Sequence, residues 1–135
     1  MLTKTRQAVA LLVAVTDEAE AALAGVRRVE LTQFPFLVGR QRSTAASNGQ
    51  NNLYLVEERD AGHSLHVSTE HFAIEYVDGK FYLVDRGSAC GTTVAGRHIG
   101  GNRKGGRTEL NDGDEVIVGT SRSPYVFSFG ILPRN

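Results

Sequence analysis

The stretch Phe36-Leu-Val-Gly-Arg40 decides the fold, together with two later ones, Val67-Ser-Thr-Glu-His71 and Asp85-Arg-Gly-Ser-Ala-Cys-Gly-Thr92. In the first stretch a short apolar run ends at Gly39, whose missing Cβ lets the backbone turn or another segment approach closely. Arg40 follows at once, and its guanidinium offers a planar set of donors that suits a phosphate or a carboxylate. This pattern predicts a short strand with an arginine at its end, where the guanidinium can bind an anion.

The two later stretches also join strands to turns. Ser68 stands three residues before His71, where an alternating apolar run begins. The third stretch predicts a tight turn between two strands, because turn-forming residues crowd into it: Gly87, Ser88, Gly91 and Thr92.

Short apolar or alternating runs between turn residues predict strands along the rest of the chain. The clearest pair is His71–Val77 and Lys80–Val84, because Asp78-Gly79 between them favours a hairpin. Other strands are expected at Gln7–Thr16, Val26–Leu31, Phe36–Val38, Leu53–Val56, Thr92–Ala95, Thr108–Leu110, Asp114–Gly119 and Tyr125–Leu132. The last of these is expected to pair with the first.

One short helix is expected at Asp17–Leu23, with Thr16 or Asp17 as its N-cap and Gly25 after its end. With no long helix and turns throughout, the sequence predicts an all-β sandwich of about eleven short, mostly antiparallel strands.

The three stretches, followed by Asp112-Gly-Asp114, resemble the signature of the forkhead-associated (FHA) domain family. That signature is Gly-Arg, then Ser-x-x-His, then an Asp-x-x-Ser-x-Asn-Gly-Thr turn, then Gly-Asp before the last strands. The resemblance implies a single FHA-type β-sandwich at 8–132, with a flexible tail at 1–7, a C-terminal tail at 133–135 and a long inserted loop at about 41–67. It also implies a non-catalytic module that binds phosphothreonine in partner proteins, downstream of a Ser/Thr kinase and without a cofactor.

By the same resemblance, the phosphopeptide-binding residues are Arg40, Ser68, Thr69, His66, Ala89, Cys90 and Gly91. Arg40 and Ser68 are expected to contact the phosphate, and Thr69 to assist. The residues expected to shape the loops are Gly39, His71, Asp85, Ser88 and Thr92. A phosphothreonine carries about −1.5 to −2 charges and three acceptor oxygens, so a cation, hydroxyls and backbone N–H groups match it.

The chain departs from the family pattern within the expected site. Cys90 stands where the family usually has an asparagine that binds the peptide main chain, and a thiol is a weak donor and acceptor. The lost interaction is worth about 1–3 kcal/mol if peptide groups stay unpaired. Thr69 replaces a frequent arginine. His66 either strengthens the pocket as the pH falls or is only a polar strand residue.

Bulk charge gives no support for a nucleic-acid or membrane partner, because Lys and Arg together number 15, as do Asp and Glu. Ser68 and His71 lack an orienting acid and a nucleophile elbow, so we expect no enzyme. The four histidines (His63, His66, His71 and His98) lack metal-ligand spacing. Gly101–Thr108 has P-loop spacing, but a turn follows it, which favours a basic loop at Gly96–Arg107.

The N-terminal residues 1–21 allow two interpretations. Lys4, Arg6 and the apolar run Ala8–Val15 imitate a signal peptide, but acidic residues follow where small neutral ones are preferred. The same run also predicts a buried first strand. The single cysteine fits a reducing compartment, and we expect a bacterial cytoplasmic protein.

Two other functions remain open. The Cys90 departure and the insertion are compatible with a scaffold that keeps the fold and binds partners without phosphate. Thr3 or Thr5 in the basic tail, once phosphorylated, could instead occupy the pocket of its own or a neighbouring chain.

Overall fold

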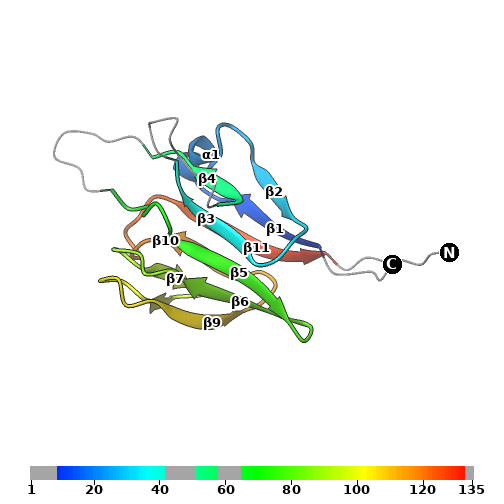
Figure 1. The fold of residues 1–135 in the computed structure, drawn as a ribbon. Coiled ribbons are helices and arrows are strands. Elements are labelled where there is room, and N and C mark those ends of the chain that lie inside the picture. Colours follow the sequence, from blue (N-terminus) through cyan, green and yellow to red (C-terminus); the bar gives the residue numbers. More distant parts are fainter. Residues whose placement is uncertain (1–8, 42–50, 58–64, 133–135) are drawn as a thin grey trace.

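Eleven strands form two sheets in the computed structural model, which describes residues 9–41, 51–57 and 65–132 (Figure 1). The six-stranded sheet has the order β2-β1-β11-β10-β7-β8. Its strands are β1 (Val9–Ala14), β2 (Arg28–Leu31), β7 (Thr92–Val94), β8 (Arg97–Ile99), β10 (Glu115–Val118) and β11 (Val126–Leu132). The predicted all-β sandwich is confirmed.

The five-stranded sheet has the order β4-β3-β5-β6-β9. Its strands are β3 (Phe36–Arg40), β4 (Leu53–Leu55), β5 (Phe72–Val77), β6 (Lys80–Asp85) and β9 (Gly106–Leu110). Strands β3 and β4 run parallel, whereas β3–β5, β5–β6 and β6–β9 are antiparallel. The prediction of a mostly antiparallel arrangement is therefore also confirmed.

The first and last strands pair as expected, with Val9 opposite Leu132 and Ala14 opposite Phe127. Strand β1 also pairs with β2, so the apolar run near the N-terminus lies inside the sheet. The core between the sheets is made by alternate residues of the strands. Its fully buried members include Leu12, Leu31, Val38, Phe72, Ile74, Leu83, Phe127 and Phe129.

Helix α1 (Asp17–Ala22) has Thr16 as its N-cap, which decides between the two expected caps. The Thr16 hydroxyl accepts a hydrogen bond from the Ala19 amide at 3.1 Å. The helix ends at Ala22, and Leu23 is its C-cap. Gly25 follows the end as predicted; its φ of 88° belongs to the left-handed region, and its N–H donates to the Glu20 carbonyl oxygen. No described helix has the length and apolarity needed to cross a membrane.

The segment Gly96–Arg107, expected to be a loop, is the clearest error in the predicted elements. It contains β8 and the start of β9. Ala95 and Gly96, with φ values of 49° and 84°, form a two-residue turn that pairs β8 with β7. Strand β8 contains a single apolar residue, Ile99, within a basic, Gly-rich segment, so no apolar pattern marks it in the sequence. The strand exists because the turn sets its register.

Several predicted segments lie wholly or partly outside the described residues. These are the tails at 1–7 and 133–135, the parts of the insertion at 42–50 and 58–64, and the residues Thr3, Thr5 and His63. The connections β6–β7, β8–β9 and β10–β11 gather at one end of the sandwich, opposite the β5–β6 hairpin (Figure 1). The candidate site lies at the end where these connections meet.

Candidate functional site

Gly39 lets the segment before β5 lie directly against β3. A Cβ at this position would collide with the Thr69 carbonyl oxygen and would lie 2.6 Å from Asn51 Nδ2. With this space free, the Arg40 amide donates to the Ser68 carbonyl oxygen at 2.9 Å. The glycine is therefore required by close backbone approach, which brings Arg40 and Ser68 together.

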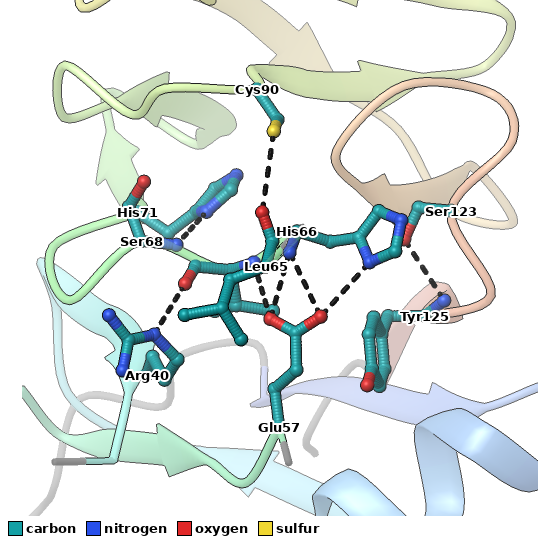
Figure 2. Close-up of polar contacts among 10 residues, drawn as sticks. Arg40, Glu57, Leu65, His66, Ser68, His71, Cys90, Ser123 and Tyr125 are labelled. Carbon is teal, nitrogen blue, oxygen red and sulfur yellow. Dashed lines mark hydrogen bonds and ion pairs between the residues drawn. The ribbon is translucent and has the colours of Figure 1, made fainter. Parts of the chain in front are cut away.

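The Arg40 guanidinium is anchored on one side only. Its Nε donates to the Val67 carbonyl oxygen at 2.8 Å, and the side chain is partly exposed (Figure 2). Within the described parts of the chain, neither of its terminal nitrogens forms a hydrogen bond or an ion pair. The two nitrogens that suit a bidentate contact with an anion thus remain available to a ligand.

His71 holds the Ser68 loop from inside the molecule. Its ring is fully buried, its Nδ1 accepts from the Ser68 amide at 2.9 Å, and its Nε2 donates to the Gly91 carbonyl oxygen at 2.7 Å. Burial lowers the pKa of His71 below its ordinary value of 6.5, against the opposing effect of the Gly91 carbonyl. The neutral ring therefore joins the Ser68 loop to the β6–β7 turn.

The β6–β7 turn is built around the buried carboxylate of Asp85. One oxygen accepts from the amides of Gly87 (3.0 Å) and Ser88 (2.9 Å), and the other from the hydroxyls of Ser88 (2.7 Å) and Thr92 (3.1 Å). The Ser88 hydroxyl in turn accepts from the Gly91 amide at 2.8 Å. Four donors compensate the burial of this acid and fix the turn.

The turn also contacts the Ser68 loop at its exposed side. The Ala89 amide donates to the Ser68 hydroxyl oxygen at 3.0 Å, which leaves the hydroxyl proton free to be donated to a ligand. Cys90 is half-buried, with its sulfur 3.7 Å from the Leu65 carbonyl oxygen. Ala89, Cys90 and Gly91 therefore border the same region as Arg40 and Ser68.

The β8–β9 connection packs on this turn. The amides of Asn102 and Arg103 donate to the carbonyl oxygens of Ala89 and Ser88, both at 2.9 Å. Arg103 and Lys104 are exposed there, so positive charge lies beside the turn. The segment continues into strand β9 instead of a helix, which removes the structural context that a P-loop needs.

His66 does not face the same way as Arg40. Its imidazole points toward Ser123 and Tyr125, and its Nδ1 lies 2.9 Å from a Glu57 carboxylate oxygen (Figure 2). In this arrangement His66 belongs to the contact between the Ser68 loop and the β10–β11 connection. The expected strengthening of the pocket by a His66 charge has no direct geometric support.

Sequence reasoning missed three polar residues that support the site: Asn51, Glu57 and Arg86. The Asn51 side chain donates to the Thr69 carbonyl oxygen at 2.9 Å and accepts from Arg86, which also reaches the Val38 carbonyl oxygen at 3.3 Å. Polar residues in loops give no periodic signal, so their partners could not be identified from the sequence. Thr69 itself is half-buried next to this group.

No group of three or more histidine, cysteine or acidic side chains in the described ranges is arranged to hold a metal ion. Of the predicted residues, the structure brings together Arg40, Ser68, Ala89, Cys90 and Gly91 around one end of the sandwich, with Gly39, His71, Asp85, Ser88 and Thr92 beneath them. These loops lie at one end of a rigid β-sandwich, which is where binding residues are often positioned.

The chain belongs to the forkhead-associated domain family, since the FHA domain model matches residues 36–119. It is 31% identical over 113 residues to an oxoglutarate dehydrogenase inhibitor of Corynebacterium diphtheriae. The matched region covers 83% of this chain and 69% of that protein. The resemblance to this family drawn from the sequence is confirmed.

Solved structures with the same fold are less similar in sequence. The yeast Pml1 splicing factor, solved in a study of its integration into the RES complex, has a TM-score of 0.67 and 23% identity, over 98% of this chain and 86% of Pml1. Mycobacterium tuberculosis EmbR, solved with a low-affinity phosphopeptide, has a TM-score of 0.63 and 23% identity. That match covers 96% of this chain, which spans only 26% of EmbR.

Proposed function

We propose that this domain is a non-catalytic module that binds phosphothreonine segments of partner proteins, downstream of a Ser/Thr kinase. The observation that carries the proposal is the Arg40 guanidinium, anchored through Nε to the carbonyl of Val67, the residue before Ser68, with both terminal nitrogens open among the described residues. A planar cation and a hydroxyl at fixed positions suit a phosphate monoester. The FHA family match and the phosphopeptide in the EmbR structure support this assignment.

The loops that carry these groups are held by buried hydrogen bonds, which supports a preorganised pocket. His71 and Asp85 fix the Ser68 loop and the β6–β7 turn before any ligand arrives. A ligand then binds without the cost of ordering these loops. Exposed Arg103 and Lys104 beside the turn add a field that favours anionic peptides, so we expect affinity to fall as salt rises.

The Arg40→Ala variant tests the proposal. We expect it to bind phosphothreonine peptides about a hundredfold more weakly than the wild type, because two charge-assisted hydrogen bonds are lost. Fluorescence anisotropy with a degenerate phosphothreonine library, run in parallel with the unphosphorylated peptides, gives the affinities. Arg28→Ala is the matched control, because Arg28 is an exposed arginine on β2, in the other sheet.

Equal binding of phosphorylated and unphosphorylated peptides would contradict the proposal. That result, with no effect of Arg40→Ala, would favour the alternative of a phosphate-independent scaffold. The relative named as an oxoglutarate dehydrogenase inhibitor supports a regulatory role through contact with another protein under either function. Recognition of a phosphorylated Thr3 or Thr5 remains a prediction, to be checked by whether phosphorylation changes the mass of the particle in solution.

The Cys90→Asn variant tests whether the unusual residue limits affinity. Cys90 is half-buried, with its sulfur near the Leu65 carbonyl oxygen, and an amide at this position could donate to and accept from a peptide backbone. We expect about tenfold tighter phosphopeptide binding, equivalent to one or two recovered hydrogen bonds. Cys90→Ala, which removes the thiol and adds no hydrogen-bonding group, is the control. An Asn variant that is folded but binds no tighter would show that the thiol is not the limiting group.

A further inference from the structure

Glu57 carries a buried carboxylate two residues after the end of β4. Its side chain is fully shielded from solvent. One oxygen accepts from the Val67 amide at 2.8 Å, and both accept from the His66 amide at 2.9 Å (Figure 2). The second oxygen also accepts from His66 Nδ1 at 2.9 Å. Such burial is tolerated because the donors replace the lost water.

The carboxylate acts on the pocket through the backbone of Val67. The N–H of Val67 donates to Glu57, while the next carbonyl oxygen, that of Val67 itself, accepts from Arg40 Nε at 2.8 Å. The Val67 side chain is buried, so this residue is held on three sides. Glu57 thus determines where the carbonyl that anchors the guanidinium lies.

We propose that Glu57 is a positioning residue of the phosphate pocket: it holds the Val67 backbone so that Arg40 is fixed through Nε and presents its terminal nitrogens to the ligand. This rests on the proposed function of Arg40 as the phosphate ligand. The same contact joins residues 57 and 66, both of which lie within the inserted loop that the sequence predicted at about 41–67. The pocket is therefore tied to β4 at the point where the chain leaves that strand.

A positioning role and a simple charge effect predict opposite changes in phosphopeptide affinity when Glu57 is neutralised. A negative charge near a phosphate pocket repels the ligand, so neutralising it should strengthen binding. Positioning predicts weaker binding, because the Glu57→Gln variant puts an amide N–H₂ group where a carboxylate oxygen accepts from His66. The direction of the change in affinity therefore separates a positioning role from a simple charge effect.

The experiment compares Glu57→Gln with Glu70→Gln. Glu70 is an exposed acid in the same loop, so its replacement removes the same charge near the pocket. We expect phosphothreonine-peptide binding to weaken about tenfold in Glu57→Gln and to stay equal or become tighter in Glu70→Gln. In an Arg40→Ala background, Glu57→Gln should cause no further loss. An unchanged or raised affinity in folded Glu57→Gln would overturn the proposal.

A second readout does not depend on phosphopeptide binding. In ¹H,¹⁵N spectra of the wild type, the Arg40 Nε–H should exchange slowly, because it donates to the Val67 carbonyl. In Glu57→Gln it should exchange fast, whereas Glu70→Gln should leave it unchanged. A protected Nε–H in Glu57→Gln would overturn the positioning role, even if no peptide binds and the proposed function has itself failed.

Glu57→Asp, which keeps the negative charge, is the second variant in case Glu57→Gln does not fold. Urea unfolding of each variant is measured first, and Glu57→Asp replaces Glu57→Gln if the latter is unfolded. The aspartate is one methylene shorter, so it cannot reach the His66 and Val67 amides in the same position. We expect weaker peptide binding and faster Arg40 Nε–H exchange in this variant too. Wild-type values for both would refute the proposal.

Discussion

The His71→Ala variant is expected to lose about 4 kcal/mol of the free energy of unfolding. The fully buried ring fills space in the core and pairs two backbone groups, the Ser68 amide and the Gly91 carbonyl. Alanine leaves a cavity and removes the hydrogen-bond partner of both groups, and the two losses of stability add. Urea denaturation followed by circular dichroism measures the change.

The His71→Gln variant is the matched control. The oxygen and nitrogen of its amide can take the places of Nδ1 as acceptor and Nε2 as donor, so both hydrogen bonds can form again. We expect this variant to lose less than half as much stability as His71→Ala. Equal losses in the two variants would show that the shape of the ring, and not its two hydrogen bonds, makes the contribution.

The same histidine makes stability depend on pH. Burial lowers the pKa of His71 in the folded state, so below pH 6.5 the unfolded chain takes up a proton that the folded ring refuses. The free energy of unfolding should therefore fall as the pH drops below 6.5, until the folded pKa is reached. The difference in stability between the wild type and His71→Gln isolates this effect from the other histidines. A difference that does not change with pH would contradict the buried neutral ring.

The Asp85→Ala variant should be destabilised by a similar amount, about 3–4 kcal/mol. Its carboxylate accepts from two amides and two hydroxyls, and alanine leaves these donors without their partner in the interior. The side chain also packs against Gly100, where a Cβ would lie 2.6 Å from Asp85 Cγ. Removing Asp85 should therefore loosen both the β6–β7 turn and the loop that packs on it.

Asp85→Asn provides the comparison for this prediction. Its amide oxygen can keep the two backbone N–H bonds, and the hydroxyls of Ser88 and Thr92 can rotate to accept from the amide nitrogen. We expect a loss of about 1–2 kcal/mol, measured by the same urea unfolding. If the asparagine variant were as unstable as the alanine variant, the negative charge itself would be the important property.

The positions of most strands along the chain and the family were predictable because their signals are local. Alternation in β5 and β6, with Asp78 and Gly79 at positive φ between them, follows from adjacent residues. The Gly-Arg, Ser-x-x-His and Gly-Thr groups are also short, so each could be recognised without knowing its neighbours in space. The sequence did not predict β8, which has only one apolar residue, or the direction of the His66 side chain, which depends on Glu57.

By itself, the sequence determined most of the residues that form strands and predicted which residue types would suit a phosphate, because both depend on chemistry or spacing within a few positions. Only the tertiary structure decided that Asn51, Glu57 and Arg86 support the pocket and that Asn102 and Arg103 bind the β6–β7 turn. These contacts join segments far apart in the chain through single polar atoms. They depend on how the two sheets pack and on which donors that packing buries. Neither can be predicted from a local sequence pattern.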